Sequence, residues 1–270
     1  MKKEPEFQNQ HKIPQVYLNQ FGYKSKLSIL KVGTSKIENV SISEFSSEIN
    51  IFDLPFDNDK IKRHYENLFN RIETRYKTIL SNLKNQGKLI PKDKYYLIAF
   101  IVSIMCRTEP FRLKISDLIK NEKTREKFIK EITIFSNDYN ETKELLDIFK
   151  MDYKLNMALG TVISHLIRVF SHFEIVIIKE KKGESWLTTD NPVYIDFKEN
   201  HSYIIPIEAE VYFPLSKEYC LFMFHPESKN KKNPLRNLTI NKVNNINFEL
   251  FDKIVKEIAN NFYEYIIINN

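Results

Sequence analysis

The sequence predicts an α+β fold in which a central helical bundle packs on a mainly antiparallel sheet. Apolar residues at helical spacing dominate the middle of the chain, whereas β-branched and aromatic runs dominate the part that follows. The C-terminal part is expected to form the sheet, and a contribution from the N-terminal segment is left open. We expect a single domain over 1–270, with an extended arm (1–58), a helical core (59–172) and a strand-rich part with one helix (173–270).

The N-terminal arm is expected to be extended. Val16, Leu18 and the stretch 27–32 alternate loosely, and residues 22–25 between them have the composition of a turn. Residues 37–58 are polar and irregular, which predicts loops with at most one short strand.

Two long helices are predicted in the core. Apolar residues keep helical spacing for six turns from 61 to 83, with Asp59 placed to cap the start and Gly87 to end the helix. The next helix begins at Pro91 and is apolar on every face from Tyr95 to Cys106, so it must be buried all round. The remaining expected elements are helices over 111–135 and 141–171, strands over 173–178 and 186–189, a hairpin of 211–213 with 219–224, an exposed basic loop over 226–236, a helix over 243–260 and a closing strand over 263–268.

Composition excludes several classes of function. The chain has 5 glycines and contains neither G-x-G-x-x-G nor G-x-x-x-x-G-K-[ST], so a glycine-cradled phosphate site of either kind is not expected. The net charge of +6 fits an RNA or DNA partner. The joint abundance of Lys, Asn, Ile, Phe and Tyr, as in an AT-rich genome, explains this charge equally well.

The cysteines and the apolar runs indicate a cytoplasmic protein. Cys106 and Cys220 lie far apart in different kinds of segment, so they support neither a disulfide framework nor a zinc site. No apolar stretch follows Met1, so no signal peptide is expected. The longest apolar run is shorter than the roughly 20 residues that span a bilayer, so no membrane partner is expected.

Five short motifs stand in a fixed order along the chain. They are the segment 11–21, Glu66 with Glu73, and the segments 106–112, 188–193 and 213–216. In this order they resemble the mainly bacterial domain-of-unknown-function family numbered 4238. The resemblance lies in five features of that family: H-x-x-P-x-x-x-L-x-x-F, spaced glutamates on a helix, an R-T-P-like turn, S-D-N-P and F-P-L-S. This chain departs from it with R-T-E-P and T-T-D-N-P. The resemblance implies no established activity, and it carries over His11, Glu66, Glu73, Arg107, Asp190 and Asn191.

Four residues are predicted to form a catalytic set. His11 can exchange a proton near neutral pH, in a segment stiffened by Pro14. Arg107 directly follows an apolar helix, and a buried guanidinium needs a partner such as Glu66, Glu73 or Asp190. Asp190 follows a predicted strand on a turn restricted by proline, which is a frequent position for a catalytic acid.

These residues allow two mechanisms and one alternative. His11 and a carboxylate could act as general base and acid while Arg107 stabilises charge on a phosphate, with Glu66, Asn191 and Arg112 binding substrate. Ranked second, Glu66, Glu73, Asp190 and His11 could hold a divalent metal that activates water. Either mechanism predicts a nuclease-like phosphodiester hydrolase, such as an effector in antiviral defence or a toxin. The alternative is a non-catalytic nucleic-acid or protein binding module in which the same polar residues form a buried structural network.

Overall fold

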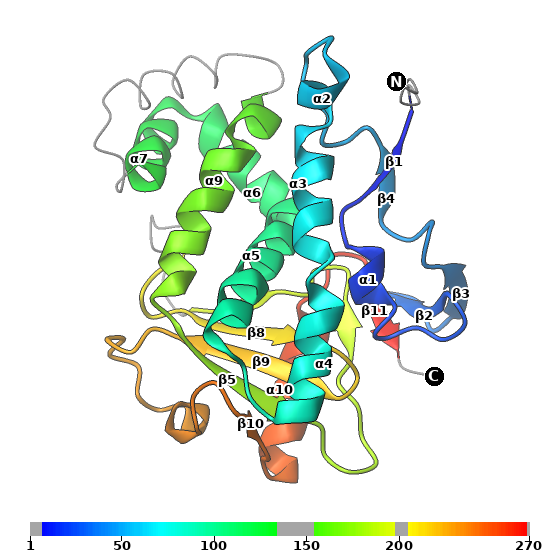
Figure 1. Cartoon of the computed structure of the whole chain (residues 1–270), viewed down its shortest axis with the longest axis vertical. Helices are drawn as coiled ribbons and strands as arrows, with labels where there is room; N and C mark the ends of the chain where they lie inside the picture. The colour runs from blue at the N-terminus through cyan, green and yellow to red at the C-terminus, as the bar shows by residue number, and fades with distance from the viewer. Residues whose placement is uncertain (1–6, 134–153, 198–204, 269–270) are drawn as a thin grey trace.

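Helices cover both faces of a central five-stranded sheet (Figure 1) in the computed structural model, which describes residues 7–133, 154–197 and 205–268. The described helices are α1 (Gln15–Leu18), α2 (Asp59–Lys62), α3 (His64–Glu73), α4 (Tyr76–Gln86), α5 (Pro91–Arg107), α6 (Glu109–Lys120), α7 (Glu122–Ile132), α9 (Lys154–Ser171) and α10 (Phe248–Asn260), with a 3-10 turn η1 (Pro234–Asn237). The predicted α+β fold is thereby confirmed.

The described strands form three sheets. The central sheet has the order β10 (Val243–Asn244), β5 (Glu174–Lys179), β9 (Tyr219–Phe224), β8 (Glu210–Pro214) and β7 (Tyr194–Asp196). A second sheet, called the blade below, has the order β3 (Ile37–Ser41), β2 (Lys26–Lys31), β11 (Tyr265–Ile268) and β6 (Thr188–Thr189). The two-stranded ribbon joins β1 (Asn9–His11) to β4 (Ser47–Ile49). Among these strands only β10 and β5 pair in parallel.

Alternate residues of the central strands enter two separate cores. On β5, Ile175 and Ile177 pack into the core under the helical bundle, whereas Val176 and Ile178 pack with α10. This alternation follows from the period-two geometry of a strand, and it explains why a strand buried on both faces has no polar side. The predicted β5 strand and the hairpin of β8 and β9 are confirmed.

Helix α5 runs through the middle of the bundle, with α9 beside it and α3 and α4 on its other side (Figure 1). From Leu97 to Arg107 every residue of α5 is buried, as the unbroken apolar run predicts. Phe100 stacks on Tyr76 of α4 with ring centroids 4.0 Å apart. The helix therefore delivers its last residue, Arg107, into the protein interior.

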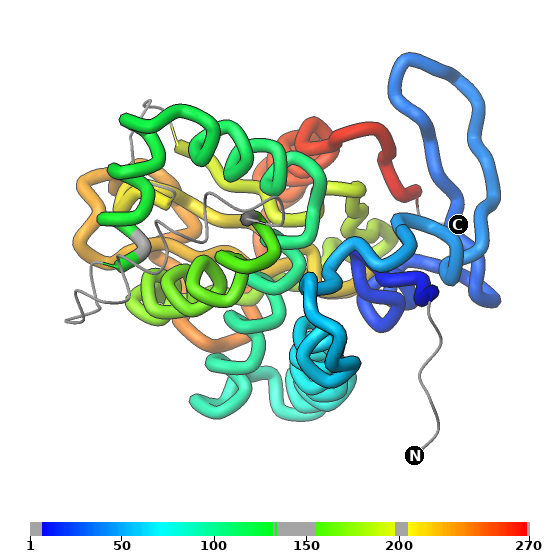
Figure 2. The backbone as a smooth tube through the Cα atoms, turned by 90° about the horizontal axis from the view of Figure 1, so that it is seen from above, coloured from blue at the N-terminus to red at the C-terminus, as the bar shows by residue number. Residues whose placement is uncertain are grey.

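The blade stands apart from the central sheet, and Figure 2 shows its hairpin of β2 and β3 projecting from the rest of the molecule. The C-terminal strand β11 closes the blade by pairing with β2 on one side and β6 on the other. Sequence analysis expected at most one short strand over 37–58, but both β3 and β4 form there. The prediction was wrong because β3 and β4 are stabilised by pairing with β2 and β1. The residues of 37–58 alone do not indicate that such partners exist.

The predicted helix over 61–83 is divided into three. Arg63 has φ −93° and ψ 19°, outside the helical region, and its buried guanidinium binds Asp53 with an Nη1–Oδ1 distance of 2.6 Å. A second break at Thr74 and Arg75 separates α3 from α4. The first cap is Asn58 rather than Asp59, whereas Gly87 ends α4 with φ 63° as predicted.

Two other helix boundaries differ because asparagine side chains cap new helices. Asn121 accepts hydrogen bonds from the backbone of Lys123 and Thr124, so the predicted helix over 111–135 is two helices, α6 and α7. Asn247 accepts from the backbone of Leu250, so the helix expected to begin at 243 begins at Phe248.

The segment around Val16 and Leu18 is not extended, because residues 15–18 form the helical turn α1 after Pro14. The loop 226–236 is not wholly exposed, since Arg236 is buried in an ion pair with Glu210, with 2.7 Å between Nε and Oε1. Of the helix expected over 141–171, residues 141–153 lie outside the described part of the chain, and α9 forms the remainder.

Candidate functional site

Arg107 lies at the end of α5 in a closed environment, with 3% of its side chain exposed. Its Nη1 donates to Glu73 Oε1 at 2.9 Å, and its Nε donates to the backbone carbonyl of Ser103 at 3.1 Å. The guanidinium also stacks over the ring of Phe69 at 4.3 Å. Within the described residues Nη2 has no hydrogen-bond partner. A buried guanidinium with a carboxylate partner fits a helix-packing role, because leaving either charge alone would be costly.

Glu66 adjoins this ion pair from α3. Burial raises the pKa of the Glu66 carboxyl, nearby Arg107 lowers it, and nearby Glu73 raises it. The seven-residue spacing predicted that Glu66 and Glu73 share one side of a helix. The two residues do lie near the same guanidinium, although only Glu73 bonds to it directly.

His11 reaches Arg107 through its backbone. The carbonyl oxygen of His11 accepts a hydrogen bond from Arg107 Nη1 at 3.3 Å. The imidazole has other neighbours, because its Nε2 lies 2.9 Å from the carbonyl oxygen of Ser43 and 3.1 Å from Nε2 of Gln15. The ring therefore fixes the ribbon against the segment that follows β3 and does not enter the ion pair of Arg107.

Asp190 anchors the C-terminal strand. Its carboxylate accepts three backbone hydrogen bonds, from Tyr263 at 2.8 Å, Glu264 at 2.7 Å and Tyr265 at 3.1 Å. Burial raises the pKa of Asp190, although these three bonds lower it. The neighbouring Asn191 exchanges hydrogen bonds with Asn261, which reinforces the same connection. The rigid turn predicted around Asp190 thus holds the start of β11 in place.

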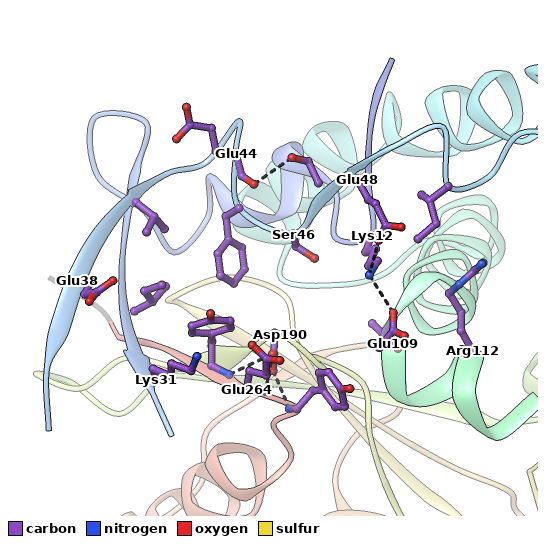
Figure 3. A pocket seen from close by; sticks show the side chains of 18 residues that line it. Lys12, Lys31, Glu38, Glu44, Ser46, Glu48, Glu109, Arg112, Asp190 and Glu264 are labelled. Carbon is purple, nitrogen blue, oxygen red and sulfur yellow. Dashed lines mark hydrogen bonds and ion pairs between the residues drawn. The ribbon is translucent and has the colours of Figure 1, made fainter. Parts of the chain in front are cut away.

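A cavity of about 920 Å³ opens between the blade, the ribbon and the first turn of α6. Figure 3 shows Lys12 and Glu109 at its α6 side and Asp190 beside Glu264 at the start of β11. The charged lining residues are mostly acidic: Glu38, Glu44, Glu48, Glu109, Asp190 and Glu264, against Lys12, Lys31 and Arg112. We call this cavity the blade pocket.

Lys12 joins the two walls of the blade pocket. Its Nζ lies 2.9 Å from Glu109 Oε2 on α6 and 3.0 Å from Glu48 Oε2 on β4. Burial opposes the charge of Lys12, but the bonds to these two carboxylates raise its pKa overall. Lys12 therefore stays charged and ties the ribbon to the helical core.

Arg112 lines the blade pocket beside Glu109, and Figure 3 shows its guanidinium turned away from Asp190. The guanidinium lies over the ring of Phe52 at 5.4 Å and donates to Asn156 Oδ1 at 3.3 Å. Burial lowers its pKa, which nearby Glu109 partly offsets. Its two contacts are weak, so the guanidinium remains available for other interactions at this end of the pocket.

The predicted site residues therefore fall into two places. Arg107, Glu73 and Glu66 gather with the backbone of His11 inside the helical core, whereas Asp190 and Arg112 line the blade pocket. Within the described residues, no three His, Cys, Asp or Glu side chains lie close enough together to hold a metal ion. Cys106 and Cys220 are buried and free.

Sequence reasoning missed the central ion pairs of the blade pocket. Lys12 directly follows His11 in the first motif, and Glu109 is the residue that makes the third motif R-T-E-P rather than R-T-P. These two residues bind one another across 97 positions of sequence. The departure at Glu109 did not point to Lys12, because the helix dipole already favours an acid in the first turn of a helix.

The fold and the pocket define an α+β protein with a helical bundle, a projecting blade and a polar cavity between them. The model of the family described as protein of unknown function (DUF4238) matches residues 9–270, so the chain belongs to that family. No curated protein and no solved structure matches the chain. In the described part of the chain, each helix is too short or too polar to cross a membrane.

Proposed function

We propose that this chain is a non-catalytic binding module, and that the blade pocket holds a positively charged segment of a partner protein. The observation that carries the proposal is the charge of the lining, in which six acidic side chains face three basic ones. The proposal is also supported by two of the residues predicted for catalysis, since Asp190 accepts three backbone hydrogen bonds and Arg107 binds Glu73, contacts that suit a structural use.

Two carboxylates are suited to a cationic ligand. Glu44 and Glu264 are exposed, line the pocket and make no ion pair within the described residues. Single exposed ion pairs contribute little, but several acting on one bound segment add up. The other four acids already have partners, since Glu48 and Glu109 bind Lys12, Glu38 binds Lys36 and Asp190 accepts three backbone amides. The attraction for an ammonium or guanidinium group therefore depends mainly on Glu44 and Glu264.

Aromatic rings in the same pocket add a second attraction. Tyr263 is 46% exposed, and Tyr265 and Phe45 meet edge to face with centroids 5.8 Å apart. Lys31 already places its Nζ 5.9 Å from the ring of Tyr265, so this ring accepts a cation. An arginine or lysine side chain that lies on such a ring keeps its charge near the carboxylates and buries its alkyl stem.

A labelled oligo-arginine peptide tests the proposal by fluorescence anisotropy. The variant Glu44→Gln/Glu264→Gln is expected to bind about tenfold more weakly than the wild type, because two charge contacts are lost. The matched control is Glu126→Gln/Glu249→Gln, which removes the same charge from exposed positions on α7 and α10. Equal affinities for the two variants, or equal binding of an oligo-glutamate peptide, would contradict the proposal.

A phosphodiester hydrolase, acting on RNA, DNA or nucleotides, is the second candidate. It is favoured by Arg107 Nη2, a buried donor without a partner among the described residues, next to the carboxyls of Glu66 and Glu73. Such a donor could bind a phosphate oxygen if the core opened around it. If this candidate is correct, the wild type hydrolyses RNA, DNA or nucleotides, and Glu66→Gln abolishes that activity without unfolding the protein. Equal rates of hydrolysis for the wild type and the variant would contradict it.

A further inference from the structure

Five exposed lysines gather away from the blade pocket, where β5, β10 and the turn after α4 meet. They are Lys88, Lys179, Lys181, Lys182 and Lys242. Lys88 and Lys242 face each other in an antiparallel bridge, and the carbonyl of Lys242 accepts from the backbone of Ile177 on β5 at 3.3 Å. Figure 1 shows β5, β10 and the end of α4 together at the lower edge of the molecule. Segments that are distant in sequence thus bring five exposed lysines onto adjoining stretches of backbone.

The surface is hollowed where β5 ends. A cavity of about 450 Å³ is lined by Lys179, Lys181 and Lys182 on one side and by Asn245 after β10 on the other. The chain can turn here because Gly183 has φ 89°, which side-chain-bearing residues rarely adopt. The parallel register that pairs Asn244 with Ile178 places this turn beside the segment after β10.

Three acidic residues lie near these lysines. Glu184 is exposed in the same turn, where its backbone N–H donates to the carbonyl of Lys181, and Glu180 also lines the hollow. Glu218 is engaged by Lys84, with 3.1 Å between Nζ and Oε1. One carboxylate oxygen of Glu180 is buried and has no hydrogen-bond partner among the described residues. Burial raises the pKa of this carboxyl, and nearby Lys179 lowers it. Within the described residues, none of the five lysines makes an ion pair.

We infer that this basic surface, named here the lysine edge, binds the phosphate backbone of double-stranded nucleic acid. Ammonium groups on neighbouring segments can contact successive phosphates and release their counterions. No aromatic side chain lines the hollow, so stacking on unpaired bases is not available and binding does not depend on sequence. The inference does not depend on the proposed function, because none of the five lysines lines the blade pocket.

The test is the salt dependence of binding to a labelled duplex of about 20 base pairs, measured by anisotropy on the full chain. If all five lysines contact phosphates, log K falls with log salt with a slope of about −4 to −5. The variant Lys179→Gln/Lys181→Gln/Lys182→Gln is expected to reduce that slope by about 3 and to weaken binding at low salt at least tenfold. The matched control, Lys229→Gln/Lys231→Gln/Lys232→Gln, removes the same net charge from another loop and is expected to bind like the wild type.

Three results would overturn the inference. One is equal weakening in both triple variants, since that would show a response to net charge alone. Another is unchanged duplex binding after the substitutions at 179, 181 and 182. The third is binding to vesicles that contain phosphatidylserine with no binding to duplex, which would assign the lysine edge to a membrane surface. Because the substituted side chains are exposed, an unchanged melting temperature is expected in both variants.

Discussion

Arg107→Ala is expected to lower the free energy of unfolding by roughly 3–5 kcal/mol. The substitution leaves the carboxylate of Glu73 in a largely buried place without its guanidinium, and it removes the stacking on Phe69. It also removes the hydrogen bond that the backbone carbonyl of His11 accepts from the guanidinium. Urea denaturation, followed by circular dichroism, measures the change directly.

Two controls separate this effect from a general loss of charge. Arg71→Ala removes an exposed arginine from the neighbouring helix α3 and is expected to change stability by less than about 0.5 kcal/mol. The double variant Arg107→Ala/Glu73→Ala is expected to be more stable than Arg107→Ala alone, because the carboxylate that Arg107 bonds directly is removed with it. If Arg107→Ala unfolded at the same urea concentration as the wild type, Arg107 would have no packing role.

Asp190→Ala is expected to cost about 3 kcal/mol, because three backbone amides of the C-terminal segment lose a charged acceptor at once. The amides of Tyr263, Glu264 and Tyr265 should then exchange with solvent tens of times faster, as the start of β11 detaches from the turn. Hydrogen exchange read by NMR resolves these three positions.

The control for Asp190 is Asp117→Ala, which removes an exposed aspartate paired only with Lys120 on α6. This variant is expected to differ from the wild type by less than about 0.5 kcal/mol. Exchange at 263–265 that stayed as slow in Asp190→Ala as in the wild type would mean that pairing with β2 alone holds the strand.

The elements that could be predicted are those whose conformation follows from the residue types and spacing within the element. The apolar run of α5 is buried wherever it packs, and the β-branched residues of β5 suit a buried strand. Three strands of the blade, β2, β6 and β11, fall in segments expected to be extended, but their assembly into a separate sheet could not be predicted, since β2 pairs with β11 from the other end of the chain. A local pattern carries no information on so distant a partner. The break between α2 and α3 at Arg63 could not be predicted for the same reason, because Arg63 forms an ion pair with Asp53 outside the helix.

The candidate site was predicted in part. A carboxylate partner for Arg107 was required by the cost of burying its charge, and Glu73 provides it. The sequence does not reveal that His11 contributes its carbonyl rather than its ring, because main-chain and side-chain contacts look alike in a motif. The role of Asp190 as an anchor depends on amides more than 70 positions away.

The polar residues of the described chain occupy two kinds of environment, buried ion pairs and an exposed pocket lining. The set around Arg107 holds α3, α5 and the ribbon together, while Glu44 and Glu264 of the blade pocket are exposed. Under the proposed function, the exposed acids beside the blade would bind the partner, and the buried ion pairs would hold the surrounding elements in place. Loss of the buried pairs should therefore affect the fold, and loss of exposed acids should affect only binding.

A hydrogen-exchange footprint of the full chain with the oligo-arginine peptide tests the central claim most directly. The account predicts slower exchange of backbone amides over 44–48 and 263–265 and in the first turn of α6, with little change over α3. Protection confined to α3 and the end of α5, or none over the blade pocket at saturating peptide, would contradict it.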